Sequence, residues 1–577
     1  MATPKQKLPR EFWWGGAVIA LVFAFLTLET WRKWGDSLID FGVQLYVPWK
    51  ISTGTVLYRD VAYLTGGPLS QYYHALLFGV FGVSVLTLVV SNLVLLALLV
   101  ALIYWSFYKA SDALTAVEAA LALLLVFAFA HYTVLGIFNY VTPYSAEIVH
   151  GLVLSVVMLA ALTYWLTEKK PWGAALAGFC AGLVLLTKPE VFMAALAALG
   201  AAFFLGRRAG KLGRSAGLML AGALVPLLGF FIHFCRLENF SESARSVFWA
   251  WTPMWGHSMA QDPFYRWCLG LDAPAFHLQM MGEQFLGLSA GLAVYVVLVR
   301  AVAETTWAKI VFVSSCVLAA ELAWRYNWRQ CGYCLLPLAL VLLVLLLRRS
   351  RPRSNMFPIL WTVFSLVLLA KLGLFVRIYH YGFALAMPAF LAAVYLLLWE
   401  LPETLRPYRV RPLYLRGVVS VVLLTGFVRM MSVSLINYDH RTIPLGHGGD
   451  RTLVLPNRPA IAATLDWIET NTPPNSTLAV LPEGAMLNYL SRRTNPAKYL
   501  RWNSAELSVF GQENMDDAFT QNSPDYVILI ERDMHEFGLK PFGEEERFGL
   551  RLKQWIDIHY KAVYAFDSPH LIIYRKK

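Results

Sequence analysis

Residues 34–54 read WGDSLIDFGVQLYVPWKISTG and directly follow the first long apolar run of the chain. The stretch contains two aspartates, Asp36 and Asp40, whose spacing of four places both carboxylates on one face of a helix. Ionisable groups near a membrane are costly and are therefore functional candidates. Two interpretations are open: a catalytic carboxylate at a membrane surface, or a pair of solvated loop charges.

The composition of the chain predicts a membrane protein with many spans. Its 577 residues are 58% hydrophobic and only 15% charged, with a mean hydropathy of +0.52, whereas soluble proteins carry about 25% charged residues. The net charge of +12 comes from Lys and Arg in short connectors between apolar runs. This distribution is typical of membrane topology and argues against nucleic acid as a partner.

Apolar runs predict the number of spans, because a helix needs roughly 17–25 mostly apolar residues to cross a bilayer. About thirteen runs approach this length, although several are short. They lie near residues 12–27, 85–107, 114–131, 146–166, 172–187, 191–205, 216–235, 285–301, 310–324, 335–347, 357–376, 383–399 and 417–433.

Basic segments predict the orientation of the bundle. With thirteen spans, five of them fall on one side, which the positive-inside bias makes cytoplasmic: PKQKLPR, EKK, GRRAGKLGR, LRRSRPR and LRPYRVRP. The N-terminus is then cytoplasmic, and the first run is expected to remain as an anchor because it has no small-residue cleavage site. We expect a multi-pass protein of the cytoplasmic (inner) membrane, with the loop 29–69 on the outer side.

The last part of the chain differs in kind. Residues 436–577 are polar and contain no further apolar run long enough to span. STLAVLPEG, PDYVILIERD and HLIIYRKK predict strands, and AMLNYLSRR predicts a helix. The predicted fold class is therefore an α-helical polytopic membrane protein with a small extracytoplasmic α/β C-terminal domain. The expected division is 1–435 for the membrane domain and 436–577 for the extracytoplasmic, periplasmic domain.

The outer side collects ionisable and polar residues from several short turns. If the spans form one bundle, these turns converge into a polar cleft at the bilayer surface. Besides the two acids of the first stretch, the candidates are Asp60 in LYRD, Glu147 at the start of a span, Lys188 and Glu190 in LLTKPEVF, and Arg377, His380 and Tyr381 in RIYHYGF.

Several candidates also have a purely structural interpretation. Asp36 would favour a helix dipole at an N-terminus, and Asp60 would order its loop by pairing with Arg59. Lys188 and Glu190 flank a proline that breaks the helix. They either face the cleft from a re-entrant corner or form an ion pair that holds two spans together.

The remaining candidates are spaced for ligand binding. Glu147 and His150 lie one turn apart, as metal ligands do, but no third ligand clusters with them. A divalent metal is therefore an alternative that is not favoured, and no other cofactor is expected. We assign Glu147 either an acceptor-binding role or a satisfied polar pair at the helix end. Arg377 and His380, three residues apart, suit a phosphate; snorkelling into the headgroup region is the alternative.

Residues 40–82, DFGVQLYVPWKISTGTVLYRDVAYLTGGPLSQYYHALLFGVFG, resemble the first outer loop of the polyprenyl-phosphate-dependent glycosyltransferases of the GT-C class. This class includes the protein O-mannosyltransferases and the lipid A aminoarabinose transferase. The shared pattern is an acid after the first span, a helix ending in glycine, and a proline before an aromatic-rich helix that ends in Phe-Gly. These positions are Asp40, Gly54, Pro68 and Phe81-Gly82.

Two departures from the class concern the chemistry. Asp40 is followed by Phe41, where the class often has a second acid. Gly66-Gly67 precede a single proline, where the aminoarabinose transferase has a lysine before two prolines. A cation for the carrier phosphate must then come from elsewhere, and Arg377, Lys188 or Arg59 could supply it.

The resemblance implies an inverting GT-C glycosyltransferase that uses a polyprenyl-phosphate-linked sugar donor. Its acceptor would be a hydroxyl of a lipid, glycan or protein, and membrane lipids would surround it. Asp40 would be the base, and cations would stabilise the departing phosphate. The residues expected to bind substrate are Asp36, Asp60, Glu147, Lys188, Glu190, Arg377, His380 and Tyr381.

Two other functions are weighed against this one. A flippase or transporter for a lipid-linked saccharide would favour repeated halves and charges near the bilayer midplane, whereas here the charges lie at one face. An O-antigen polymerase or ligase is usually built around a large loop late in the bundle, whereas here a large loop comes first.

Overall fold

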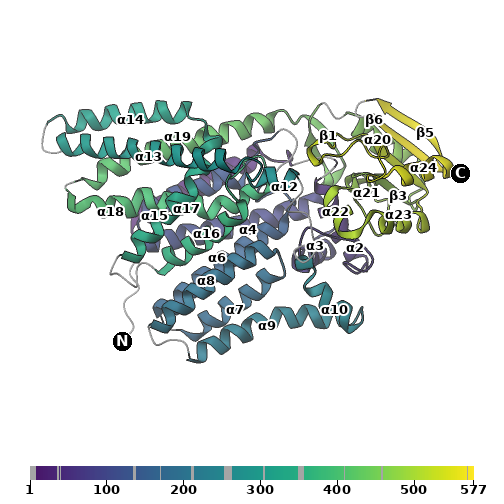
Figure 1. Ribbon diagram of the computed structural model, residues 1–577, viewed down its shortest axis with the longest axis horizontal. Helices are drawn as coiled ribbons and strands as arrows, with labels where there is room; N and C mark the ends of the chain where they lie inside the picture. Colours follow the sequence, from purple (N-terminus) through teal and green to yellow (C-terminus); the bar gives the residue numbers. More distant parts are fainter. Residues whose placement is uncertain are drawn as a thin grey trace.

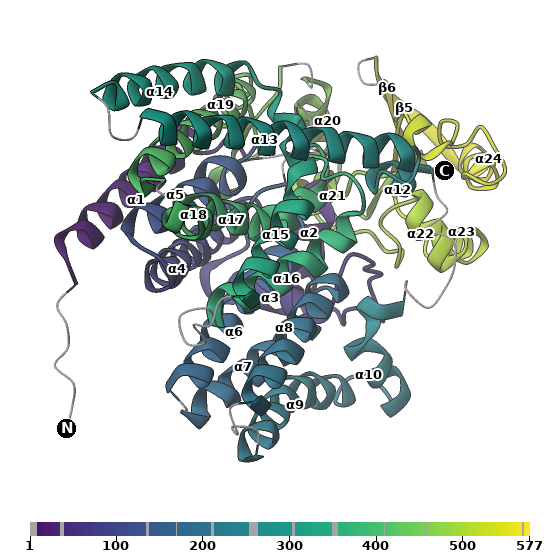
Figure 2. The same cartoon turned by 60° about the vertical axis from the view of Figure 1, so that its left-hand side comes forward.

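Long helices make up most of the computed structural model and end against a smaller α/β region, at the right in Figure 1. The structure describes residues 8–34, 38, 40–133, 138–168, 170–208, 213–252, 263–302, 306–348, 356–408, 410–456, 459–567 and 570–577. Figure 2 shows the same division from another side, with α1 (Arg10–Glu29) at the edge of the bundle.

The bundle is that of a multi-pass membrane protein. Among the described residues, nine helices are long and apolar enough to cross a membrane, and three shorter apolar helices accompany them. Each of the thirteen predicted runs overlaps a helix, so the helices themselves are where the sequence places them. Thirteen spans are not confirmed, because the three shorter helices and α14 (Ala308–Arg325) lack the length or the composition of the nine.

The remaining elements of the helical part follow in chain order. They are α2 (Asp40–Ser52), α3 (Pro68–Phe81), α4 (Val85–Ala110), α5 (Ala113–Ala122), the π-helix η1 (Leu123–Ala128), α6 (Ala146–Glu168), α7 (Pro171–Leu185), α8 (Pro189–Arg208), α9 (Gly213–Cys235), α10 (Phe240–Val247), η2 (Trp249–Trp251), α12 (Pro263–Cys268), α13 (Pro274–Val302), η4 (Trp328–Cys334), α15 (Leu335–Arg348), α16 (Met356–Leu372), η5 (Tyr381–Ala386), α17 (Met387–Tyr395), the π-helix η6 (Leu396–Glu400), α18 (Leu401–Leu405), η7 (Arg406–Tyr408) and α19 (Pro412–Asp439).

Local chemistry explains where several helices begin. Ser84 and Asp112 cap α4 and α5, each accepting a hydrogen bond from a backbone N–H in the first turn. Pro68, Pro171 and Pro412 occupy the first position of α3, α7 and α19, where the missing N–H costs nothing.

The helices differ in how deeply they lie in the bundle. Most residues of the segment 382–408 are buried, so it is central, whereas most residues of 274–302 are exposed, so this helix would face lipid. Figure 1 agrees: α13 and α14 form one edge, α7 and α9 the opposite edge, and α17 lies between them. His380 and Tyr381 directly precede this central segment, so this part of the predicted cleft adjoins the core.

A four-stranded sheet organises the C-terminal part, with strand order β3-β4-β6-β5. Strands β3 and β4 are parallel, and the other neighbours are antiparallel. The three predicted strands are present as β3, β4 and β6, and the predicted helix as α21; β5 and the hairpin β1–β2 were not predicted. The bounds are β1 (Ile443–Leu445), η8 (Gly448–Asp450), β2 (Thr452–Val454), α20 (Pro459–Asn471), β3 (Leu478–Leu481), α21 (Ala485–Ser491), α22 (Ser504–Phe510), α23 (Gln512–Gln521), β4 (Tyr526–Ile530), η9 (His535–Phe537), α24 (Leu550–His559), β5 (Tyr560–Asp567) and β6 (His570–Lys576).

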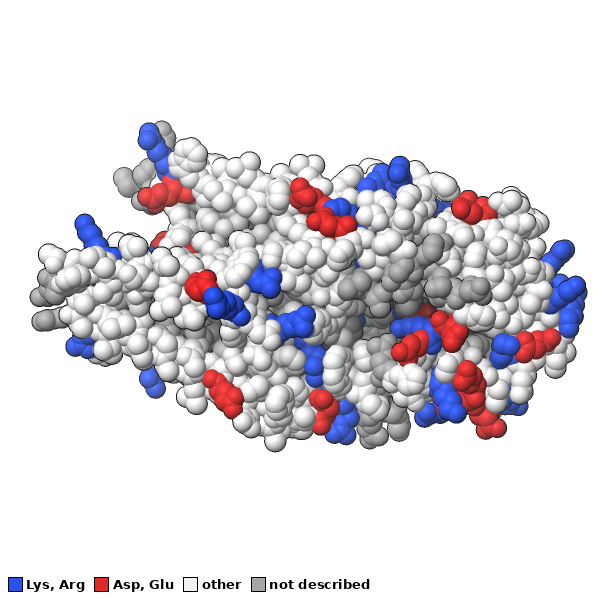
Figure 3. Space-filling model, turned by 90° about the horizontal axis from the view of Figure 1, so that it is seen from above, with Lys and Arg blue, Asp and Glu red and all other residues white. Residues whose placement is uncertain are grey.

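The C-terminal part packs directly on the first loop and its helices. A Cβ on Gly42 would lie 2.2 Å from the backbone nitrogen of Met486, so α2 and α21 meet backbone to backbone. Asp450 accepts hydrogen bonds from the backbone N–H of Val85 (2.8 Å) and from the Tyr489 hydroxyl (2.9 Å). In Figure 3, charged side chains are sparse over the helical bundle and more frequent at the right, where the C-terminal part lies.

Candidate active site

One of the two acids of the first stretch lies where α2 begins. Asp36 lies outside the described residues, and Asp40 is the first residue of α2, described for its backbone only. The next residue, Phe41, is buried and stacks on Tyr144, which precedes α6 (centroids 6.3 Å apart). The start of α2 is therefore held between the segment leading into α6 and, through Gly42, the C-terminal helix α21.

Glu147 is fully buried in a polar seam that four segments share. Its Oε1 accepts hydrogen bonds from the Tyr63 hydroxyl and from the Gln71 amide nitrogen, the latter at 3.0 Å. The same nitrogen lies 2.7 Å from the Tyr63 hydroxyl and 3.2 Å from Gln44 Oε1. Among the described residues, Glu147 Oε2 and Gln71 Oε1 have no hydrogen-bond partner. Glu147 is thus held by neutral donors, with one carboxylate oxygen left over.

Gly66 and Gly67 lie where the loop packs too closely on its neighbours for a side chain. A Cβ on Gly66 would lie 2.5 Å from Glu147 Cγ, and one on Gly67 would lie 2.3 Å from the Leu186 carbonyl oxygen. The Gly67 N–H donates to the Thr187 carbonyl (2.7 Å), and the Leu69 N–H donates to that of Leu186 (3.1 Å). The first loop therefore lies directly on Glu147 and on residues 187–190, the turn between α7 and α8 that we call the TKPE corner.

The TKPE corner separates two helices as the proline predicts. Helix α7 ends at Leu185 and α8 begins at Pro189. Lys188 and Glu190 are nearly buried, with Nζ and Oε1 4.0 Å apart. Both belong to the same corner, so the pair does not bridge two distant spans.

His380 is half-buried near this corner. Burial, together with the positive charges of Lys371, Lys188 and Arg377, lowers the pKa of His380 to about 3, which favours the neutral imidazole. Its Nδ1 accepts a hydrogen bond from the Gly382 N–H at 3.2 Å. The imidazole could therefore serve a ligand as a neutral hydrogen-bonding group and not as a cation. Tyr381, the first residue of η5, is described for its backbone only.

Arg377 is engaged by its own surroundings. Its guanidinium lies over the Trp267 ring at 3.8 Å from the centroid, and its Nε donates to the Trp267 carbonyl at 2.7 Å. Asp272 lies 3.8 Å from its Nη2. Trp267 belongs to α12. The ring of Phe264 on the same helix contacts the His380 ring and lies 4.9 Å, centroid to centroid, from the ring of Phe537 in η9. Helix α12 thus connects the Arg377–His380 segment to the C-terminal part.

Asp60 stands apart from the Glu147 seam and orders its own loop. It accepts a hydrogen bond from the Val56 N–H (2.8 Å) and forms an ion pair with Arg59. The hydrogen bond from Arg59 lowers the pKa of Asp60. Arg59 also donates to the Leu237 carbonyl (2.7 Å). This geometry agrees with the interpretation that Asp60 orders its own loop. Arg59 is engaged by Asp60 and by the Leu237 carbonyl.

His150 and Glu147, spaced like metal ligands, turn to different partners. His150 Nδ1 lies 2.9 Å from Ser70 Oγ, and its ring meets that of His74 at 5.3 Å. His74 is fully buried; burial lowers its pKa well below the usual value, and His150 adds to this effect. His74 and His150 are therefore part of the packing between α3 and α6.

The sequence interpretation missed several residues of this region. Gln44, Tyr63 and Gln71 complete the Glu147 seam. The one feature of the sequence that could have pointed to them is that each is a polar residue among apolar neighbours. The C-terminal part holds two buried glutamates in ion pairs with half-buried arginines: Arg501–Glu506 (2.5 Å) and Arg532–Glu483 (2.7 Å). Arg501 interacts electrostatically with Tyr144, the residue that stacks on Phe41.

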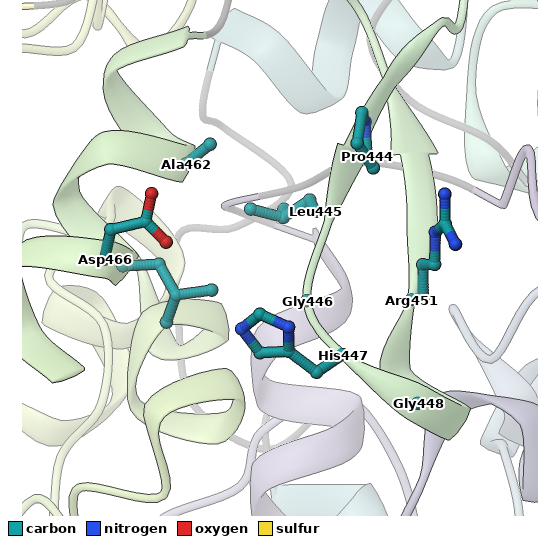
Figure 4. A pocket seen from close by; sticks show the side chains of 9 residues that line it. Pro444, Leu445, Gly446, His447, Gly448, Arg451, Ala462 and Asp466 are labelled. Atoms are coloured by element: carbon teal, nitrogen blue, oxygen red, sulfur yellow. The ribbon is translucent and has the colours of Figure 1, made fainter.

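A separate cavity of about 360 Å³ lies in the C-terminal part, between the β1–β2 hairpin and α20. Leu445 and Leu465 contribute apolar walls, and Figure 4 shows Asp466 on the helix and His447 on the hairpin flanking the space. Its lining includes none of the predicted site residues, so it is distinct from the candidate site at α2.

Comparison with known proteins finds no matching family model and no matching curated sequence. Among solved structures, the chain is similar to the oligosaccharyltransferase AglB from Archaeoglobus fulgidus in complex with an inhibitory peptide and a dolichol-phosphate. The TM-score is 0.49 at 13% identity, over 90% of this chain and 70% of that one. It is also similar to ArnT from Cupriavidus metallidurans bound to undecaprenyl phosphate, with a TM-score of 0.45 at 12% identity, over 98% of each chain. At these levels the similarities identify no residue and no substrate of this chain.

Proposed function

We propose that the protein is an integral-membrane GT-C glycosyltransferase whose active site lies at the outer face of the cytoplasmic membrane. It takes a sugar from a polyprenyl phosphate and passes it, with inversion, to a hydroxyl of a lipid, glycan or protein. The observation that supports this best is the meeting of α2, which starts at Asp40, with the buried carboxylate of Glu147 through Gln44 and Gln71.

The proposed reaction is a single displacement at the anomeric carbon. Asp40 takes the proton of the acceptor hydroxyl as its oxygen attacks that carbon. The bond from the anomeric carbon to the phosphate oxygen breaks, and the carrier phosphate leaves with the electron pair. Lys188 would stabilise the charge on this phosphate, and His380 would donate a hydrogen bond to it. Glu147 would accept hydrogen bonds from sugar or acceptor hydroxyls.

Sugar transfer in membranes tests the proposal. Dolichol-phosphate and undecaprenyl phosphate, the carriers bound in the AglB and ArnT structures, charged with radiolabelled sugars, are suitable donors. We expect Asp40→Asn to lower transfer by roughly 100-fold to 10,000-fold, the usual contribution of a general base. Asp36→Asn is measured beside it: activity near that of the wild type would identify Asp36 as a helix-end charge, and a loss would assign it to substrate binding. Full activity of Asp40→Asn at normal protein level would refute the assigned base.

A further inference from the structure

The Gln71 side chain occupies the centre of the buried seam. Its amide nitrogen faces three oxygens: the Tyr63 hydroxyl at 2.7 Å, Glu147 Oε1 at 3.0 Å and Gln44 Oε1 at 3.2 Å. An amide NH₂ at this point supplies two hydrogens without adding a charge, and the Tyr63 hydroxyl supplies a third by donating to Glu147. A glutamine on α3 therefore joins α2, the first loop and α6 at one point.

This seam connects the two acids to which the proposed reaction assigns roles. Position 40 lies one helical turn before Gln44 on α2, and residues four apart share a helix face. Gln44 and Gln71 then form a direct path of hydrogen bonds from that face to the carboxylate of Glu147. A fixed path of this kind holds the Glu147 carboxylate in a constant position relative to the start of α2, and a displacement reaction depends strongly on such geometry.

We propose that Gln71 and Gln44 are positioning residues that fix the Glu147 carboxylate relative to the start of α2, and that Glu147 is held so that one oxygen serves the substrate. The inference rests on the proposed function. Gln71 and Tyr63 use only Oε1 of Glu147, and Oε2 is buried without a partner among the described residues. A network needed for stability alone would gain from satisfying both oxygens, because an unpaired buried acceptor costs about 1–3 kcal/mol.

The first variant reverses the hydrogen-bonding character of the hub. Gln71→Glu has nearly the same shape but places an oxygen where the three acceptors need a donor, which displaces Glu147. We expect kcat to fall roughly 10-fold to 100-fold, the scale of an ångström-sized misplacement, while the KM for the lipid-linked donor changes less than kcat.

A matched control lies on the same helix. Tyr73→Phe removes the hydrogen bond of 2.8 Å between the Tyr73 hydroxyl and Ser91 Oγ, which ties α3 to α4 outside the seam. It should leave kcat within about twofold of the wild type, because a single hydrogen bond of this kind contributes only about 1 kcal/mol to stability.

A swapped pair separates positioning from packing. In Gln71→Glu with Glu147→Gln, an amide and a carboxylate again face each other, and Gln44 can turn its amide to donate. We expect the melting temperature to return to within a few degrees of the wild type, whereas transfer stays at the level of the single variant because the carboxylate now projects from α3 and not from α6.

The outcomes distinguish this inference from the proposed function. If the wild type transfers sugar and Gln71→Glu is fully active, or if the swapped pair recovers transfer, the inference alone is overturned. The seam would then serve packing and not the positioning of Glu147. Absence of transfer in the wild type from either carrier would overturn the proposed function and this inference together. The inference is supported if Gln71→Glu and the swapped pair both lose activity while Tyr73→Phe stays active.

Discussion

Two groups of buried acids in this molecule are held in opposite ways. Among the described residues, the hydrogen-bond partners of Glu147 in the membrane part are neutral: Tyr63 and Gln71. Glu506 and Glu483 in the C-terminal part each pair with a guanidinium, Arg501 and Arg532. Burial raises the pKa of Glu506, although Arg501 opposes that rise. A carboxylate paired with a cation is held by that cation within the fold, whereas the Glu147 carboxylate has neutral donors on one oxygen and no hydrogen-bond partner among the described residues on the other.

The largest effect that this comparison predicts is on the ion pairs. Arg501→Met leaves Glu506 without its counterion, and losing one partner of a buried pair costs about 3–5 kcal/mol. We expect a correspondingly large fall in the melting temperature of the detergent-solubilised protein. In the double variant Arg501→Met with Glu506→Gln, both charges are gone and most of the stability should return. Equal destabilisation of the single and the double variants would contradict the view that these pairs are structural.

A smaller effect is expected where the first loop touches the neutral seam. Gly66→Ala places a methyl group 2.5 Å from Glu147 Cγ, and overpacking of this kind costs about 1–3 kcal/mol. Transfer should fall together with stability, since Glu147 must move. Gly79→Ala on α3 is the control: its Cβ would meet nothing within 4 Å, and Ala is favoured over Gly in a helix by about 0.5–1 kcal/mol. A Gly66→Ala protein as stable and active as Gly79→Ala would show that the seam tolerates displacement.

The smallest effect concerns a buried group surrounded by cations. The pKa of His380 is about 3 in the folded protein, below the unfolded value of about 6.5. As the pH falls below the unfolded value, the unfolded chain takes up a proton that the folded one does not, so stability drops by about 1.4 kcal/mol per pH unit. His380→Asn keeps an acceptor for the Gly382 N–H and does not titrate. Its melting temperature should therefore fall less than that of the wild type between pH 6.5 and 5.5; identical slopes would show that His380 is solvated.

The sequence allowed accurate prediction wherever the signal is local. Every apolar run proved helical, because a backbone in lipid must satisfy its hydrogen bonds within one segment. In the C-terminal part, β3, β4, β6 and α21 were predicted from runs of apolar residues between turn residues. Strand β5 was missed because its sequence, YKAVYAFD, mixes charge with apolar residues at an edge.

The candidate site was only partly predictable, for a physical reason. Charge in an apolar chain is conspicuous, so Asp40, Glu147, Lys188 and His380 could be singled out from the sequence. Tyr63, Gln71 and Gln44 are uncharged and common residue types, and nothing in their own segments shows that they meet Glu147. Their role comes from the packing of α2, α3 and α6, because contacts between residues distant in the chain depend on how helices assemble. Membrane class, helix positions and charged candidates were thus encoded locally, whereas the seam that joins them is a product of that assembly.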